Sequence, residues 1–260
     1  MKAVYCTLRL PLFSSKLPTA YQIAISAPLP LSATLIGALV RALARVDQGC
    51  SGVNQEEAAK KGLELMLSGL LEATSRVTCD GVTRGTVILK RSRELEGRAT
   101  EGSFRTDAIR REYVFSRKLQ IIYIFKDDEK AKLALRAISL MDRIGDTESI
   151  ISPVEWGISN VRRVEGDGVN TTIRGSLVKE MPDGCYSIIR AYLIPRLTNW
   201  PQRPKVDTFY IPIKTTTRLG LTVLTPSMLK IRPIEDSFIV EVDTPEGPAK
   251  VLIPSDPRWL

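Results

Sequence analysis

Strand-like and helix-like patterns of apolar positions alternate along the first part of the chain. Residues Ala3–Leu10 alternate apolar and polar side chains, which predicts a half-buried strand. Pro28 and Pro30 then interrupt the chain before Ser32, a residue type that favours a helix N-cap. Apolar side chains recur at helical spacing over about 33–46. The pattern therefore predicts one strand followed by an amphipathic helix.

Further elements follow up to about residue 155. They are a helix capped by Asn54 that runs to about Thr74, strands at Thr86–Lys90 and Leu119–Phe125, a helix over Glu129–Ile144 that is capped by Asp127 or Asp128 and ended by Gly145, and a strand at Ser149–Val154. This order is that of the split β-α-β, ferredoxin-like (RRM-like) fold. It predicts a four-stranded antiparallel sheet with helices on one face.

The pattern changes after Trp156, where short β-rich stretches replace the helices. They lie at Val161–Val164, Thr171–Val178, Tyr186–Ile194, Phe209–Ile213, Leu221–Leu224 and Phe238–Val242. We therefore expect an α+β chain with a ferredoxin-like region over residues 1–155 and a β-rich region, without a long helix, over residues 156–260.

Most of the positive charge lies in one part of the chain. The 260 residues have a net charge of +8, and residues 1–118 alone hold 18 basic and 11 acidic side chains. Within this part, residues 84–118 hold 10 basic and 5 acidic side chains. The 28 residues 91–118 are also long for a connection between two strands, and such loops are usually functional or disordered. The segment is either the footprint of a polyanionic partner or a solvated excursion from the surface.

Composition narrows the possible chemistry. The chain has no histidine, which excludes Ser-His-Asp and Cys-His catalysis and histidine-ligated zinc. Four separated cysteines, Cys6, Cys50, Cys79 and Cys185, form no C-x-x-C pair and are expected to be reduced thiols in a cytoplasmic protein. No signal peptide or apolar run long enough to span a bilayer is evident, so we expect no membrane association.

One face of the expected sheet is left without helices. Tyr5, Thr7 and Arg9 of the first strand point to this face. RNA-recognition modules use the corresponding face to stack bases. Arg9 is therefore a candidate RNA contact, and the alternative is that a second layer covers the face.

Three segments resemble a known family. Residues Ala27–Leu39 resemble the proline-rich loop and first helix of the CRISPR-associated "Cas five" family of the RAMP superfamily. Arg105–Phe115 resembles the far limb of its thumb, and Ile144–Ser149 resembles the turn after its helix. The order and the spacing of the three segments agree with the family over about the first 155 residues.

The resemblance implies a subunit of a type I CRISPR interference complex, Cascade, in the archaeal type I-A branch of antiviral defence. Such a subunit grips the 5′ handle of the crRNA and caps the filament of backbone, or Cas seven-type, subunits. The large or small subunits of Cascade would be further partners, with target DNA an indirect one. Residues 91–118 would form the thumb hairpin, which folds over the RNA.

Candidate RNA-binding residues follow from charge and from the resemblance. They are Arg9, Lys90, Arg91, Arg93, Arg98, Arg105, Arg110, Arg111 and Tyr113. The basic side chains would neutralise phosphates, and Tyr113 either stacks on a base or packs at the thumb base. The Ser32–Thr34 amides either bind a phosphate or belong to a simple capped helix. Glu148 is interpreted as a turn or salt-bridge residue.

The expected function is binding without catalysis. One branch of the family, in type I-C systems, cleaves precursor RNA with a Tyr/Lys/His-type site, and this sequence lacks the histidine. We therefore predict no catalytic residue, no metal and no cofactor. Two alternatives stay open: a crRNA-processing endoribonuclease that uses Tyr113 or Lys90, and a protein-assembly module whose basic loop binds an acidic partner.

Overall fold

The computed structural model describes residues 1–15, 17–18, 23–46, 54–78, 81–92, 106–146, 148–197, 205–218 and 220–259. Within these ranges the elements are β1 (Lys2–Phe13), β2 (Ile23–Ala24), α1 (Ser32–Leu43), α2 (Gln55–Leu67), β3 (Leu70–Val77), β4 (Val82–Ser92), β5 (Thr106–Phe125), α3 (Asp128–Ile138), β6 (Ser152–Arg163), β7 (Gly168–Val169), β8 (Ile173–Arg174), a short 3-10 helix (Gly175–Leu177), β9 (Tyr186–Tyr192), β10 (Val206–Arg218), β11 (Leu221–Pro226), β12 (Leu229–Lys230), β13 (Ser237–Val242) and β14 (Ala249–Pro254). The described chain is mostly β-sheet with three α-helices, and none of these helices is long and apolar enough to cross a membrane.

A large antiparallel sheet forms the middle of the molecule. Its central strands lie in the order β6-β1-β5-β3, and each neighbouring pair is antiparallel. The predicted strand at Ala3–Leu10 is therefore confirmed as part of β1, with Val4, Cys6, Leu8 and Leu10 all buried. The predicted strand at Leu119–Phe125 is the second half of β5.

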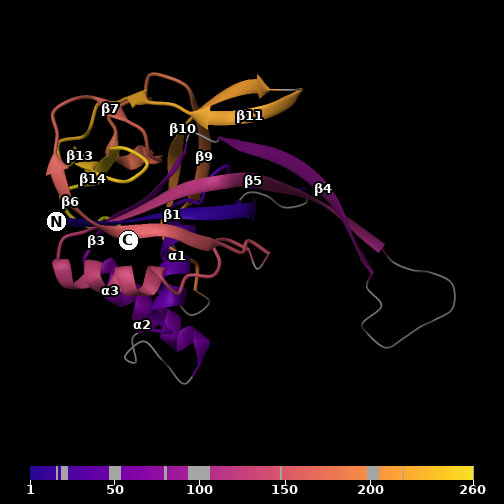
Figure 1. The fold of residues 1–260 in the computed structure, drawn as a ribbon, viewed down its shortest axis with the longest axis horizontal. Coiled ribbons are helices and arrows are strands. Elements are labelled where there is room, and N and C mark those ends of the chain that lie inside the picture. Colours follow the sequence, from indigo (N-terminus) through magenta and orange to yellow (C-terminus); the bar gives the residue numbers. More distant parts are fainter. Residues whose placement is uncertain are drawn as a thin grey trace.

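Helices cover one face of this sheet and C-terminal strands cover part of the other (Figure 1). The helix side holds the largest apolar cluster, which joins residues of β1, β3 and β5 to α1 and α3. On the opposite side Ile122 and Ile124 of β5 pack against Val240 and Val251 of β13 and β14. A second layer thus covers the part of this face around Thr7, which is buried, and leaves Arg9 exposed.

The second helix is shorter than predicted, and a strand was missed. Asn54 caps α2 as expected, accepting a hydrogen bond from the Glu57 amide, but the helix ends at Leu67 and not near Thr74. A Cβ on Gly69 would come within 2.6 Å of the Asp127 carboxylate, so the chain turns closely past the start of α3. Leu70 and Leu71 kept helical spacing by coincidence, and the eight residues of β3 are all buried.

Three other predictions near α1 and α3 were wrong in detail. Ser32 is the first residue of α1 and not its cap, because its hydroxyl donates to the Ala73 carbonyl of β3 at 2.9 Å. Asp127 caps α3 as expected, but this helix ends at Ile138. Met141 and Ile144 are buried from the following turns, which is why their apolar spacing resembled a longer helix. The predicted strands at Ser149–Val154 and Val161–Val164 belong to one strand, β6, which spans residue 155.

β4 and the first half of β5 extend away from the body of the molecule (Figure 1). Residues Val82–Ser92 pair antiparallel with Thr106–Ser116, so the first half of β5 and all of β4 form a long two-stranded arm. We call these two segments the arm. Residues 93–105 lie outside the described residues, and so do the predictions made for them.

The C-terminal half is rich in strands, as predicted, and its described part holds no α-helix. Four predicted stretches correspond to β9, β10, β11 and β13, whereas Thr171–Val178 contains only the two-residue β8 and the 3-10 helix. β14 was not predicted. It pairs with β13 to complete the second layer.

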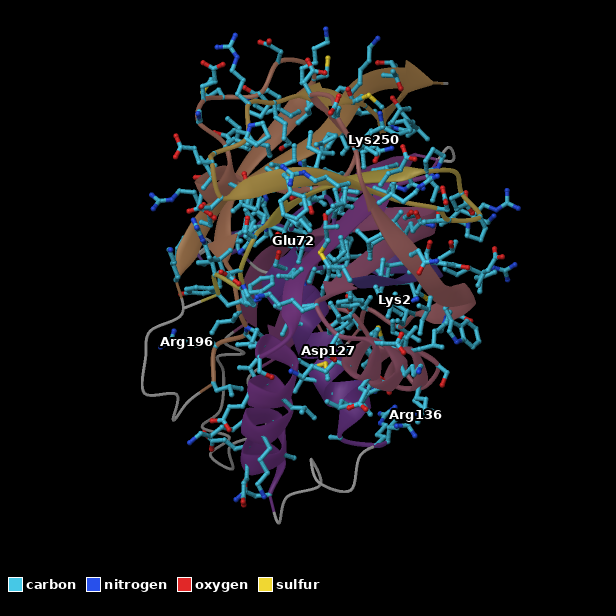
Figure 2. All side chains as sticks on the ribbon, turned by 90° about the vertical axis from the view of Figure 1, so that its left-hand side faces the viewer. Lys2, Glu72, Asp127, Arg136, Arg196 and Lys250 are labelled. Carbon is cyan, nitrogen blue, oxygen red and sulfur yellow. The ribbon has the colours of Figure 1, made fainter. Side chains whose placement is uncertain are left out.

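A buried ion pair joins this half to the central sheet. Nε of Arg174 in β8 lies 2.8 Å from the Glu72 carboxylate of β3, and both side chains are at most 2% exposed. The Arg174 guanidinium also lies 4.6 Å from the centre of the Trp259 ring, whose indole donates to the Leu70 carbonyl. Figure 2 shows Glu72 in the interior of the molecule. Burial raises the pKa of Glu72 to about 7, although Arg174 opposes that shift.

Candidate nucleic-acid interface

The turn after α3 is locked to the end of β1. The Asp146 amide donates to the Ser14 carbonyl at 3.0 Å, and the Ser14 amide donates to the Ser149 hydroxyl at the same distance. Gly145 has φ +93°, and a Cβ there would lie 2.7 Å from the Ser14 carbonyl oxygen. Only glycine fits this position without a shift of the backbone. The turn therefore holds its acidic side chains in fixed places.

Arg111 of the arm reaches this turn and is enclosed by it. Its guanidinium forms ion pairs with Asp146 and with Glu148, the latter at 3.2 Å, and Nε donates to the Ser14 hydroxyl at 3.1 Å. Only 13% of the side chain is exposed. Arg111 was predicted to contact RNA, and the structure places it in an intramolecular network at the base of the arm.

Tyr113 belongs to the same network. Its hydroxyl donates to Glu148 at 2.6 Å, and the Arg111 guanidinium lies 5.4 Å from the centre of its ring. Burial, followed by the hydrogen bond to Glu148, raises the pKa of Tyr113. The phenol is therefore protonated at neutral pH. Of the two alternatives for Tyr113, this geometry matches packing at the arm base, with Glu148 as its salt-bridge and turn partner.

A basic pocket lies on the other side of Asp146. Its cavity has a volume of about 470 Å³. It is lined by Ser15, by Ala33, Thr34, Gly37, Ala38 and Arg41 of α1, by Arg143, Gly145 and Asp146 of the turn, and by Pro195 and Arg196 after β9. Three arginines from three separate segments thus surround one cavity, and the single carboxylate among the lining residues is already paired with Arg111.

Two of the three arginines are available to a ligand. Arg41 lies 3.6 Å from the Asp142 carboxylate, so it is partly neutralised. Arg143 and Arg196 have no ion pair within the described part of the chain, and Figure 2 shows Arg196 at the periphery of the molecule. Guanidinium groups in this arrangement favour a phosphate, which accepts several hydrogen bonds from one or two arginines.

The beginning of α1 adds a further attraction for an anion. Leu31 stands at the N-cap position without a side-chain hydrogen bond to the helix, since Ser32 is engaged with β3 instead. Ala33 and Thr34 of this uncapped first turn line the pocket. The positive end of the helix dipole and the amides of its first turn therefore lie beside the arginines. A simple cap by Ser32 was therefore a wrong prediction, and phosphate binding by the Ser32–Thr34 amides stays a prediction.

The remaining predicted residues are spread over the arm and the sheet. Arg110, next to Arg111, is exposed and has no ion pair among the described residues, and Arg9 is exposed on β1. Lys90 and Arg91 lie on β4, where the structure describes the backbone only. Arg93, Arg98 and Arg105 lie outside the described residues.

Sequence reasoning missed the three arginines of the pocket. Arg143 had a local signal, since it directly precedes the segment Ile144–Ser149 that carried part of the family resemblance. The sequence identified Arg41 only as a residue on the polar face of α1, and no sequence pattern marked Arg196 as a binding residue. Their meeting depends on the packing of the segment after β9 against α1, where a Cβ on Gly37 would touch Pro195 at 3.4 Å.

Comparisons with known proteins confirm the resemblance noted in the sequence. No family model matches the chain. A protein from Methanocaldococcus jannaschii described as CRISPR-associated protein Cas5 is 33% identical over 161 residues, which is 60% of this chain and 64% of the relative. A Thermoproteus tenax protein of the same description is 28% identical over 189 residues, or 70% of this chain and 76% of the relative. The matched region thus spans slightly less than two thirds of the first relative.

Solved structures share the fold at low sequence identity. A CRISPR protein from Archaeoglobus fulgidus aligns over 96% of this chain and 98% of its own, with a TM-score of 0.57 and 15% identity. A chain of a CRISPR RNA-guided surveillance complex aligns over 89% of this chain and 91% of its own, with a TM-score of 0.50 and 14% identity. At such identities the likeness concerns the fold alone.

Proposed function

We propose that this chain is a Cas5-type subunit of a type I CRISPR effector complex and that it binds the 5′ handle of the crRNA without cutting it. Two relatives described as CRISPR-associated protein Cas5 support the family. Both come from archaea, which agrees with an archaeal, type I-A-like source and a cytoplasmic role in antiviral defence. The fold shared with a chain of an RNA-guided surveillance complex supports a place in such an assembly.

The ferredoxin-like assignment belongs to this proposal. The strand order β6-β1-β5-β3, with the helix pair between β1 and β3 and α3 between β5 and β6, supports a split β-α-β core. We keep the division into a ferredoxin-like region over 1–155, with a thumb over about 91–118, and a β-rich region over 156–260. The direction of the arm, away from the body, supports its role as the thumb (Figure 1).

The basic pocket is the observation that carries the RNA-binding proposal. Arg41, Arg143 and Arg196 converge on a cavity at the uncapped start of α1, with room for a phosphate and its sugar. Each phosphate that an arginine neutralises releases counterions, so binding must weaken as salt rises. The arm residue Arg110 and the sheet residue Arg9 would hold further phosphates.

Fluorescence anisotropy with the full chain tests the proposal. The probe is a fluorescein-labelled RNA that carries the repeat-derived 5′ handle, titrated at several salt concentrations. Replacing Arg41, Arg143 and Arg196 together by alanine should weaken binding roughly 100-fold. The slope of log K against log salt should become shallower by about 2, as expected for three phosphates of a single strand.

A matched triple variant provides the control. Arg136, Arg162 and Arg232 are exposed arginines outside the pocket, and their replacement removes the same total charge. It should lower affinity only slightly. Equal losses in the two triple variants would mean that net charge alone attracts the RNA, and this would overturn the pocket as the binding site.

Absence of cleavage is a separate part of the proposal. Tyr113 has a raised pKa and is protonated, and its hydroxyl donates a hydrogen bond to Glu148. A phenol in this state is a poor general base. Incubation of the purified protein with precursor crRNA should leave the RNA intact. Specific cutting that is lost on replacing Tyr113 or Lys90 would instead establish the endoribonuclease alternative.

The proposed protein partners are a backbone, Cas seven-type subunit and the large or small subunits of the complex, which would bring target DNA indirectly. Co-expression followed by affinity purification tests this. The chain should be recovered with a backbone subunit and with RNA of defined 5′ end. Recovery with an acidic partner protein and no RNA would favour the alternative of a protein-assembly module.

A further inference from the structure

One aromatic side chain at the root of the arm is exposed. Phe115 of β5 is 40% exposed, whereas Phe13, Phe125 and Phe209 are almost completely buried. A single exposed apolar side chain is common on protein surfaces, so the role of this ring has to be argued from its neighbours. The second layer formed by β13 and β14 lies toward the opposite end of the sheet from the arm (Figure 1).

The ring rests on a neighbouring strand at a glycine. Phe115 pairs with Thr83 across β4 and β5, and Gly85 is two residues further along β4 on the same face. A Cβ on Gly85 would lie 3.0 Å from Cε2 of the ring. The ring thus lies close to the backbone at Gly85, and glycine at position 85 leaves the space that it occupies.

Two unpaired arginines flank the ring. Arg117 is two residues after Phe115 on β5, between Ser116 and Leu119, where the pairing of β5 with β1 is irregular. Arg9 lies on β1 next to the same region, because its neighbour Leu10 pairs with Ser116. Both side chains are exposed, and neither takes part in an ion pair between described residues.

We propose that Phe115, supported by Gly85 and flanked by Arg9 and Arg117, stacks on an unpaired base of single-stranded RNA bound to this chain. This inference rests on the proposed function and assigns a second contact point, outside the basic pocket. The ring supplies the stacking face, and the arginines neutralise the phosphates on either side of the base. A protein partner that needed only an apolar contact would leave both guanidinium groups without an acceptor.

The test uses the full chain and a series of handle-bearing RNAs, each with 2-aminopurine at one position. Stacking on Phe115 should change the 2-aminopurine fluorescence at one position in the wild type. Phe115→Leu keeps the bulk but removes the aromatic face, so it should abolish that change and weaken binding roughly 5- to 100-fold. Phe115→Trp should keep both the signal and the affinity.

Salt dependence separates the ring from its neighbours. Phe115→Leu should leave the slope of log K against log salt unchanged, because no charge is lost. Arg9→Ala and Arg117→Ala should each make that slope shallower by about 0.7. Phe238→Leu is the control, since Phe238 is a half-buried ring with the Arg163 guanidinium 4.7 Å from its centre on the second layer. It should change neither affinity nor fluorescence.

An abasic nucleotide at the responding position gives a measurement that does not depend on the folding of a variant. It should weaken RNA binding by the wild type as much as Phe115→Leu does. In the Phe115→Leu variant it should cause no further loss of RNA affinity. Unchanged affinity and fluorescence in Phe115→Leu would overturn the inference. So would normal RNA binding together with loss of a co-purified subunit, because the ring would then contact protein. If the wild type binds no RNA at all, the proposed function itself fails.

Discussion

Arginines in two regions of this molecule have opposite surroundings. Arg174 is buried in the interior, where it pairs with Glu72 and lies against Trp259. Arg143 and Arg196 line an open pocket without a carboxylate of their own. Burying a guanidinium without a partner lowers the stability of the fold, because the charge loses its hydration. An exposed guanidinium stays hydrated and can bind a ligand. The same residue type thus stabilises the fold in one region and is free for binding in the other.

Arg111 at the base of the arm is intermediate between these regions. It is mostly buried and fully paired, like Arg174, yet its partners Asp146 and Glu148 are themselves partly exposed. Its neighbour Arg110 is exposed and unpaired within the described residues. The difference shows that charge counted along the sequence overstates the charge available to a ligand. Substitutions in each region test that distinction.

The largest effect is expected in the interior. Arg174→Met leaves the Glu72 carboxylate buried without a cation and should lower the free energy of unfolding by about 3–5 kcal/mol. Urea denaturation at pH 8 measures this loss. Arg232→Met is the control, because Arg232 is exposed and pairs with Glu180 at the surface, and its loss should stay below about 1 kcal/mol. Similar losses in both variants would contradict the comparison.

The pH dependence of stability should report the same pair. The folded state keeps the proton of Glu72 up to about pH 7, while the unfolded chain releases it near 4.5. Between these values the unfolded state binds fewer protons, so this group lowers the free energy of unfolding as pH rises, by an amount on the order of 2–3 kcal/mol. Comparing denaturation curves of wild type and Glu72→Gln from pH 4.5 to 8 isolates this decline, which should be absent in the variant.

An effect of similar size is expected at the turn that supports the pocket. In Gly145→Ala the new Cβ would sit on a residue with positive φ and would collide with the Ser14 carbonyl. The substitution should lower the free energy of unfolding by about 2–3 kcal/mol and displace Arg143. Gly247→Ala is a matched control, because Gly247 has φ +87° with no atom within 4 Å of the added Cβ. It should cost about 1 kcal/mol. Thermal denaturation and RNA titration of both variants measure the difference, and only Gly145→Ala should weaken RNA binding.

The smallest change in stability concerns the adjacent arginines of the arm. Arg111→Ala should lower the free energy of unfolding by about 1–2 kcal/mol, because it breaks ion pairs that are only partly screened. Arg110→Ala should change stability by less than about 0.5 kcal/mol and should make the salt slope of RNA binding shallower by about 0.7. If Arg111→Ala lowers RNA affinity more than Arg110→Ala while stability stays unchanged, the assignment of the two residues is reversed.

Charge reversal of both residues addresses the remaining alternative. Replacing Arg110 and Arg111 by glutamate should weaken RNA binding through the first and destabilise the arm base through the second. Unchanged RNA affinity with loss of a co-purified protein would show that this part of the arm binds protein.

Local pattern was sufficient where one periodicity governs one element. The alternation of β1, the Asn54 cap of α2, the Asp127 cap of α3 and the strand-rich C-terminal half all follow from neighbouring residues. The family resemblance came from local segments too. β3 was missed because both of its faces are buried, so that it has no polar–apolar alternation and its leucines continue the spacing of α2.

The sequence by itself determined the types of most elements, the excess of basic residues in the first 118 positions and the absence of histidine chemistry. Only the tertiary structure decided which arginines are free. Arg111 and Arg174 are neutralised by carboxylates 35 or more positions away, and Arg41, Arg143 and Arg196 converge from three separate segments. The physical reason is that an ion pair depends on distance in space and on burial, neither of which is encoded in the spacing along the chain.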